Sequence, residues 1–239
     1  MRAGALVVLT AAVLLAGCTS RTVGEPVAGE IPLPAPAPSA TAPSSSSAVD
    51  GCEYVETPGE EASVGLPTDV TADHVVLATA SGQLPIALTP AETPCTVRSF
   101  AHLVDQQFYD GTVCHRLTNS AGLKVLQCGD PKGDGTGGPG YTIPDELPTT
   151  LPPAADGLVT YPRGTVAMAN AGPSTGGSQF FLVYGDSTLP PDYAVFGTVE
   201  ETGLTTLDTI AARGIAPGGS CPEDGAPAER VDLVAAVIG

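Results

Sequence analysis

The amino-acid sequence predicts a mainly β protein, a closed antiparallel barrel whose ends are covered by two helices. Short runs of apolar and β-branched residues recur along the chain, and Gly- and Pro-rich loops separate them. Only two segments carry the periodicity of an amphipathic helix. With 29 Gly, 24 Pro and 5% aromatic residues, the composition indicates many turns around a modest aliphatic core.

The folded unit is predicted to begin with a β-hairpin. Residues 75–79 and 84–88 are apolar, strand-like runs, and the Ala-Ser-Gly-Gln sequence between them favours a turn. The other predicted strands share the same short length and flanking loops: 112–117, 125–128, 165–170, 179–184, 194–199 and 231–238. We find no internal repeat.

Two helices are predicted to accompany these strands. Thr93 provides an N-cap and Pro94 the first helical position. The apolar residues that then share one helical face are Val97, Phe100, Ala101, Val104 and Phe108. Gly111 is typical of the position just past a helix end, and residues 205–212, which end before Gly214, predict the second helix.

The N-terminal residues resemble a bacterial lipoprotein signal. Arg2 precedes an apolar run over residues 3–16, which is too short for a comfortable transmembrane helix. The run ends in Leu-Ala-Gly-Cys, so that small residues precede Cys18. We interpret residues 1–17 as a signal peptide and Cys18 as the lipidated first residue of the mature chain, anchored by its acyl chains. An ordinary secretory signal with a chance cysteine is the alternative.

Three regions are predicted after the signal peptide. Residues 18–50 are expected to hold the lipidated cysteine and a disordered linker of Pro, Ala and Ser. Such a linker has too few apolar side chains to offset the entropy of ordering, and its alternating prolines favour an extended spacer. Residues 51–71 are predicted to be an N-terminal extension that wraps the domain surface, and residues 72–239 the folded domain.

The charge balance restricts the expected partners. The chain has 9 basic and 26 acidic residues, a formal net charge of −17. This argues against nucleic acid, whose phosphates require clustered Lys and Arg, and against a polybasic membrane patch. Membrane contact is therefore predicted through the lipid anchor only. The acidic surface favours solubility and, as a hypothesis, clients with cationic segments.

The chain has five cysteines besides Cys18, and export would permit disulfides. Cys114 and Cys128 are expected on neighbouring strands and are the favoured pair. Cys52 and Cys221 could pair with each other, or one of them could pair with Cys95. Because five is odd, at least one thiol is expected to be left over or to pair between chains. A zinc site at Cys114, His115 and Cys128 is the alternative, but it lacks a second close ligand pair.

Four ordered blocks of sequence form the most specific pattern in the chain. They are FYDGTVCHR at 108–116, QCGDP at 127–131 followed by GTGGPGY at 135–141, VAMANAGP at 166–173, and GSQFFL at 177–182. Their order and spacing resemble the cyclophilin family of peptidyl-prolyl cis/trans isomerases over about Val75 to Ile238. The resemblance implies a closed eight-stranded antiparallel barrel capped by two helices, X-Pro isomerase activity, and no metal or other cofactor.

The chemistry of X-Pro rotation indicates what such a site must do. The barrier of about 18–20 kcal/mol arises from amide resonance, and no covalent bond breaks. The site therefore needs no nucleophile, but it must bind the twisted amide more tightly than either planar form. A cation beside the prolyl nitrogen would do this, because the nitrogen lone pair localises as the amide twists. Arg116, which matches the family's catalytic arginine, is the candidate.

The resemblance assigns a catalytic set. Phe181 matches a position in the apolar slot for the proline ring. Gln127 and Gln179 match positions that hydrogen-bond the substrate backbone or orient the arginine, and Asn170 matches the strand along which the peptide lies. The complete expected set is Arg116, Gln127, Asn170, Gln179 and Phe181. Taken singly, these residues have ordinary interpretations as surface, turn or core residues.

The resemblance also assigns substrate-binding residues. Val125 and Leu189 are expected walls of the proline slot. Ala169 and Ala171 flank Asn170 on the strand whose backbone would pair with the client. Gly135 matches a position at the groove rim where a side chain would obstruct.

The sequence departs from the family pattern at three points. Residues 118–122 lengthen the turn after Arg116. Lys124 stands where the family has a pocket aromatic, and Tyr193 where a His is common, so both are candidate substrate-binding residues. The chain contains no Trp, which many members use to bind cyclosporin, so weak cyclosporin binding is expected.

The leading hypothesis is a monomeric isomerase on the extracytoplasmic face of a bacterial cell membrane. Its expected partners are Pro-containing segments of secreted or cell-envelope proteins. A non-catalytic module that binds Pro-containing peptides in the same groove is the alternative, which retention of Arg116 disfavours. An unrelated β-rich lipoprotein, such as a cell-wall adhesin, is the remaining hypothesis.

Overall fold

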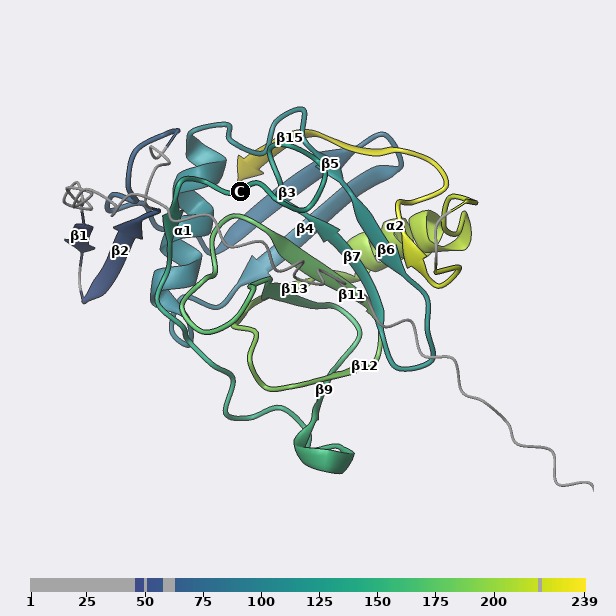
Figure 1. Cartoon of the computed structure of the whole chain (residues 1–239). Helices are drawn as coiled ribbons and strands as arrows, with labels where there is room; N and C mark the ends of the chain where they lie inside the picture. The colour runs from purple at the N-terminus through teal and green to yellow at the C-terminus, as the bar shows by residue number, and fades with distance from the viewer. Residues whose placement is uncertain (1–45, 50, 58–62, 219–220) are drawn as a thin grey trace, which may run out of the picture. The chain divides into compact units, whose positions relative to one another are not determined.

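An antiparallel sheet of ten strands dominates the structure, and two α-helices pack against it (Figure 1). The computed structural model of the chain describes residues 46–49, 51–57, 63–218 and 221–239. The predicted mainly β class with two helices is confirmed within these residues. Cys18, the signal peptide and most of the predicted linker lie outside them.

The sheet contains strands from both ends of the domain. Its members are β3 (His74–Thr79), β4 (Gly82–Leu88), β5 (Val113–Cys114), β6 (Arg116–Thr118), β7 (Lys124–Cys128), β10 (Thr165–Met168), β11 (Phe180–Gly185), β13 (Val195–Val199), β14 (Asp224–Gly225) and β15 (Val231–Ile238). They are arranged in the order β14-β6-β7-β11-β10-β13-β4-β3-β15-β5. The two helices are α1 (Pro94–Asp105) and α2 (Glu201–Ala212).

Three shorter groups complete the secondary structure. Strands β1 (Ser46–Val49), β2 (Cys52–Glu56) and β8 (Tyr141–Thr142) form a small sheet, and β9 (Val159–Tyr161) pairs with β12 (Ser187–Leu189). A 3₁₀ turn, η1 (Ala155–Gly157), precedes β9. These strands were not predicted from the sequence, because segments of two to five residues carry too little periodicity to be recognised.

The prediction of a closed eight-stranded barrel is wrong. The sheet has ten strands, and its ladder runs from β14 to β5 without closing, so the sheet is a curled half-barrel. The single strand predicted at 112–117 is broken at His115 into β5, which pairs with β15, and β6, which pairs with β7. The hydrogen-bonded ladder is therefore interrupted at this residue, and only an isolated bridge between Val113 and Asp130 crosses the gap.

A cluster of aromatic rings forms the centre of the core. Phe180 packs edge to face on Phe100, with ring centroids 5.3 Å apart, and on Tyr109 at 5.6 Å. Phe196 completes the cluster 4.9 Å from Phe100, and all four side chains are buried. Such aromatic pairs add to the stability expected from buried area alone. The cluster fixes α1 against the concave face of the sheet, because Phe100 belongs to that helix.

A distant carboxylate caps the N-terminus of α1. Thr93 is the N-cap residue and Pro94 the first helical residue, as predicted, but the Thr93 side chain makes no capping hydrogen bond. Instead, both carboxylate oxygens of Glu146 accept from the first-turn amides of Cys95 and Thr96, at 2.9 and 2.8 Å. These bonds satisfy donors that the helix itself leaves unpaired, and the negative charge is favourable at that end. The helix ends at Asp105, short of the predicted Phe108.

The N-terminal extension is fastened to the domain at β2. This strand pairs with β8, and a disulfide joins its Cys52 to Cys95 of α1. The Tyr54 hydroxyl, fully buried, donates to the carbonyl oxygen of Cys95 at 3.0 Å. The segment beyond β2 continues along the domain, where Thr57 donates its backbone N–H to Gly140.

The cysteine pairing agrees with the favoured prediction and settles one alternative. Cys114 of β5 is bonded to Cys128 of β7, so a disulfide links strands on the two sides of the interrupted ladder. Cys52 pairs with Cys95 rather than with Cys221. The expected leftover thiol is not found, since no cysteine in the described part of the chain is free. No helix in that part is long and apolar enough to cross a membrane.

Removing the two disulfides separately is expected to destabilise the fold to different extents. The Cys52–Cys95 bond closes 43 residues and the Cys114–Cys128 bond 14. Loop-closure entropy gives losses of about 4 and about 3 kcal/mol, respectively. Urea unfolding of the two Cys→Ser double variants, compared with the wild type, measures both. Equal midpoints for all three proteins would contradict a structural role for these bonds.

Candidate active site

A pocket of about 320 Å³ lies where β6, β7 and β11 meet the loop after β12. Six of its nine lining residues are apolar or aromatic, and one charged side chain, Arg116, stands at its edge. The lining residues are Arg116, Leu123, Val125, Gln127, Ala169, Asn170, Phe181, Leu189 and Tyr193. We call this space the apolar pocket. Eight of its nine lining residues belong to the predicted catalytic and substrate-binding sets.

Aromatic rings build the floor and one wall of the apolar pocket. The Phe181 ring contacts Tyr193 edge to face, with centroids 5.4 Å apart, and lies 6.2 Å from Tyr161. The Tyr161 hydroxyl donates to the carbonyl oxygen of Pro190 at 3.1 Å and accepts from the Tyr193 backbone N–H at 3.3 Å. Burial raises the pKa of Tyr161 to about 12, so the hydroxyl stays protonated as a donor. The Tyr161 hydroxyl thus holds the loop that carries Tyr193 in place beside the pocket.

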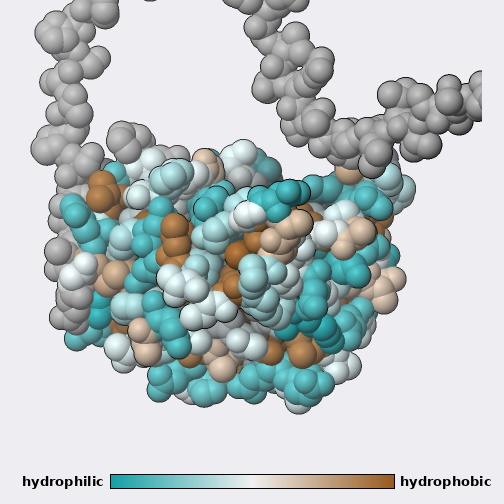
Figure 2. Space-filling view, turned by 90° about the horizontal axis from the view of Figure 1, so that it is seen from below, coloured by the Kyte–Doolittle hydropathy of each residue, from teal (hydrophilic) through white to brown (hydrophobic). Residues whose placement is uncertain are grey.

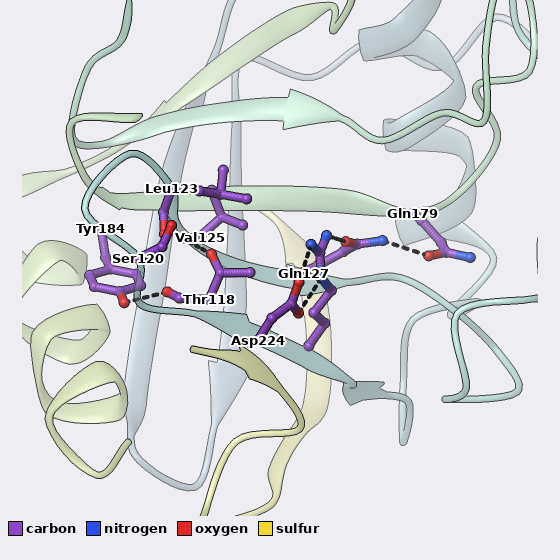
Figure 3. A network of polar contacts seen from close by, with 9 residues as sticks. Thr118, Ser120, Leu123, Val125, Gln127, Gln179, Tyr184 and Asp224 are labelled. Atoms are coloured by element: carbon purple, nitrogen blue, oxygen red, sulfur yellow. Dashed lines mark hydrogen bonds and ion pairs between the residues drawn. The ribbon is translucent and has the colours of Figure 1, made fainter. Parts of the chain in front are cut away.

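The Arg116 guanidinium is held on two sides, by Asp224 and by Gln127, both of which are labelled in Figure 3. Its Nε and Nη2 each donate to one carboxylate oxygen of Asp224 at 2.7 Å, and Nη1 donates to the Gln127 side-chain oxygen at 3.1 Å. The hydrogen bonds with Asp224, foremost, raise the pKa of Arg116, which therefore stays charged. A guanidinium has five N–H donors. One N–H on each Nη thus remains for a ligand.

The hydrogen-bond network continues from Gln127 to the loop at residues 133–140, which we call the glycine-rich loop. The Gln127 side-chain amide donates to the Gln179 side-chain oxygen at 2.9 Å. The Gln179 amide donates in turn to the carbonyl oxygens of Gly135 and Gly137, at 3.0 and 2.8 Å. Because each amide donates in one direction and accepts in the other, the chain of bonds fixes the orientation of both glutamines. Gln127 and Gln179 therefore orient the arginine in this structure.

The glycine-rich loop is organised by a buried carboxylate. Asp130, fully buried, accepts hydrogen bonds from the backbone N–H groups of Lys132, Asp134 and Gly135. Gly135 has φ +88° and a side chain there would lie 3.6 Å from His115, which is ordinary contact. This backbone conformation by itself favours glycine at the position.

A second pocket of about 440 Å³ extends the groove beyond Gln127. It shares Gln127, Ala169 and Asn170 with the apolar pocket, so the two are continuous. The predicted residues Gly135, Ala171 and Gln179 line this second pocket, together with Thr57 from the N-terminal extension. Its walls are neutral and rich in hydroxyl and backbone groups. Figure 2 shows the molecule from the side of β9 and β12, where apolar residues form small areas enclosed by hydrophilic ones.

The structure does not bring Lys124 to either pocket, contrary to the prediction. Leu123 lines the apolar pocket instead. The Lys124 backbone N–H donates to the Ser187 hydroxyl at 2.9 Å, and the residue faces Gly185 across an irregularity in the β7–β11 register. Leu123, Val125 and Gln127 share one face by strand alternation and line the pocket, so Lys124 faces away from it. The pocket wall is therefore aliphatic where a lysine was expected.

Asn170 has a second role beside lining the groove. Its side-chain amide donates to the carbonyl oxygen of Asp192 at 2.8 Å, and its side-chain oxygen accepts from the Gly172 N–H at 3.2 Å. The residue thus ties the segment 169–171, which follows β10, to the loop that carries Tyr193.

The residues of the site that were not predicted from the sequence include Leu123, Tyr161, Thr57 and Asp224. Asp224 lies 108 residues from Arg116, and its only local signal is the Asp-Gly turn in which it stands. Tyr161 and Thr57 act through contacts made by segments that look like loops in the sequence.

The acid sensitivity of folding should depend on His115, which separates β5 from β6. Burial lowers the pKa of His115 below its ordinary 6.5; Asp130 and Asp134 oppose this shift and Arg116 reinforces it. As the pH falls below 6.5, the unfolded chain binds a proton that the folded chain resists, so stability falls until the folded pKa is reached. His115→Asn should flatten this dependence, measured as unfolding free energy between about pH 7.5 and 5.5.

The control for that experiment is His74→Asn, at an exposed position where β3 begins. An unchanged slope in the His115 variant, equal to those of the wild type and the control, would exclude this residue as a source of the acid sensitivity.

Comparison with known proteins places the chain in a family. A family model, cyclophilin type peptidyl-prolyl cis-trans isomerase/CLD, matches residues 74–237. The probable peptidyl-prolyl cis-trans isomerase B of Mycobacterium tuberculosis is 54% identical over 177 residues, which cover 72% of this chain and 56% of the relative. A protein of the same name from Mycobacterium leprae is 56% identical over 172 residues, covering 70% and 57%. The chain thus spans little more than half the length of these relatives.

Solved structures agree with this assignment. A crystal structure of a cyclophilin type peptidyl-prolyl cis-trans isomerase from Cryptosporidium parvum matches with a TM-score of 0.57 and 29% identity, covering 70% of this chain and 98% of that chain. A second crystal structure of that protein, in the presence of the dipeptide Ala-Pro, matches with a TM-score of 0.56. With the family model covering more than half of its residues, the chain belongs to the cyclophilin-type peptidyl-prolyl cis-trans isomerase family.

Proposed function

We propose that this chain catalyses cis/trans isomerisation of X-Pro bonds. The observation that carries the proposal is the Arg116 guanidinium, held with two N–H groups uncommitted at the edge of an apolar pocket. The pocket walls, Phe181, Leu123 and Val125 among them, suit a proline ring. The names of the relatives at 54 and 56% identity support the same activity.

The geometry suggests how the reaction would be accelerated. A proline ring in the apolar pocket places its amide beside Arg116, while the residue before proline extends toward the second pocket. Rotation about the C–N bond removes amide resonance and concentrates a lone pair on the prolyl nitrogen. A fixed cation and donor favours that twisted state over both planar forms, which is the requirement for a higher turnover. Neither proton transfer nor a covalent intermediate is involved.

The peptide strand would bind along Ala169–Ala171. The backbone N–H of Ala169 donates to Gln179, and that of Ala171 to the Thr175 hydroxyl, at 2.9 and 2.8 Å. Client pairing at these two positions therefore has to use their carbonyl oxygens rather than these N–H groups. The presence of Ala-Pro with the Cryptosporidium parvum relative supports Pro-containing peptides as the ligand class.

Exchange NMR on a short X-Pro peptide tests the proposed function directly. Saturating added protein should speed cis–trans exchange of the X-Pro peptide and leave an X-Ala peptide of the same length unaffected. Peptide shifts that change without faster exchange would favour the alternative, a non-catalytic Pro-peptide-binding module or chaperone. If the protein neither speeds exchange nor changes the peptide shifts, both the isomerase proposal and the binding-module alternative are contradicted.

The proposed location is the extracytoplasmic face of the cell membrane, with the chain lipid-anchored at Cys18 and acting on secreted or cell-envelope proteins. The sequence before the domain supports this, since small residues and an apolar run precede the cysteine. Cys18→Ser should release the chain from the membrane fraction and abolish incorporation of labelled palmitate. Unchanged fractionation of that variant would contradict the anchor.

A further inference from the structure

The strand β14 places a carboxylate directly behind Arg116. Both oxygens of Asp224 accept hydrogen bonds from that one guanidinium, on the edge formed by Nε and Nη2 (Figure 3). The side chains are equally exposed, at 38% each, so the pair is half-buried. An exposed ion pair with a single contact contributes little, but two parallel bonds add a fixed geometry. Another pair in the domain, Arg163–Asp208, is joined by a single bond from Nη2 at 2.9 Å.

Backbone pairing fixes the position of Asp224. It lies opposite Thr118 in the β14–β6 ladder, and the neighbouring Glu223 carbonyl accepts from the Asn119 N–H at 2.9 Å. On the other side, the Ala216 N–H donates to Ala226 at 2.8 Å. The carboxylate therefore stands on the strand next to the one that carries Arg116. Its position does not depend on the long side chain of the arginine.

Two separate restraints then define the orientation of the guanidinium. Asp224 holds its Nε–Nη2 edge, and Gln127 holds Nη1. Gln127 alone would leave the group free to turn about that one bond. The carboxylate removes this freedom, and the two uncommitted N–H groups keep one direction relative to the apolar pocket.

We infer that Asp224 is a positioning residue, which orients Arg116 for the X-Pro isomerisation proposed above. The inference rests on that proposed function. The carboxylate also has an opposite effect, because its charge reduces the positive potential that Arg116 presents to the substrate. The two effects predict opposite changes in the isomerisation rate when the charge of Asp224 is removed. If orientation dominates, removing the charge slows the reaction, whereas if potential dominates, removing it accelerates the reaction.

The test compares Asp224→Asn with the wild-type chain and with Asp208→Asn as a matched control. The control breaks an arginine–carboxylate pair on α2, outside both pockets. Exchange NMR at several concentrations of an X-Pro peptide separates turnover from KM. Misplaced donors cost about 10- to 100-fold in rate. We expect a loss of that size in turnover for Asp224→Asn, a smaller change in KM, an unchanged Tm and no effect of the control substitution.

A wild-type measurement keeps the inference testable if the variant does not fold. The Arg116 side chain, observed by ¹⁵N NMR, should show slow rotation and resolved Nη protons, as a guanidinium held on two edges must. Rapid averaging of these signals would overturn the inference, as would an Asp224→Asn protein of equal or higher turnover. An inactive wild type would instead contradict the proposed function, so the two failures are distinguishable.

Discussion

Replacing Arg116 with alanine is expected to lower kcat/KM for X-Pro isomerisation by about 10²- to 10³-fold, the cost of deleting one preorganised donor at a developing charge. Among the residues that the structure describes, Arg116 has the only charged side chain that lines the apolar pocket. Its removal leaves the pocket walls in place, so Pro-containing peptides should still bind. Exchange NMR gives the rate, and peptide shift perturbation gives the affinity, on the same samples.

Two further variants decide whether charge or shape carries this effect. Arg116→Lys keeps the charge but lacks the planar fork that contacts Asp224 and Gln127 at once, so an intermediate rate is expected. Arg213→Ala is the matched control, because it removes a surface arginine that is paired with Glu229 at 3.0 Å. Its rate should equal that of the wild type. An Arg116→Ala protein as fast as the wild type would exclude the electrostatic mechanism.

The longer elements of the fold were predictable because their patterns are local. The hairpin, the N-terminal turn of α1 and the final strand at 231–238 each carry a periodicity or a capping residue of their own. The break at His115 was not predictable, since residues 112–117 read as one continuous strand. The break arises because residues 113–114 pair with β15 whereas residues 116–117 pair with β7.

The same distinction applies to the site. Arg116, Gln127, Gln179 and Phe181 lie in blocks whose order resembles the family, so their convergence on one groove was expected. The partner of the arginine was not, because Asp224 arrives on a two-residue strand from a Gly- and Pro-rich connection. The place of Lys124, by contrast, follows from strand alternation alone, which sets Leu123 beside Val125 and Gln127 on the pocket face and turns Lys124 to the other face.

Phe180 and Phe181, adjacent on β11, are expected to respond to substitution in opposite ways. Successive strand residues face opposite sides of a sheet. Phe180 accordingly packs among the rings of Phe100, Tyr109 and Phe196 in the core. Phe180→Ala should lower the free energy of unfolding by about 3–5 kcal/mol, the usual cost of emptying a buried aromatic site. Phe181→Ala should cost less stability, because one side of its ring faces the apolar pocket.

For peptide affinity the expected order of the two variants is reversed: Phe181→Ala should lose more than Phe180→Ala. Phe181→Ala removes the pocket floor and should raise KM for an X-Pro peptide, whereas Phe180→Ala, assayed well below its Tm, should bind the peptide like the wild type. Urea unfolding and peptide titration on both variants give a two-by-two comparison in which each protein controls for the other. General loosening of the domain would weaken stability and affinity together in both proteins. A crossed result, in which stability falls mainly in one variant and affinity mainly in the other, is explained only if the core face and the pocket face of β11 serve separate purposes.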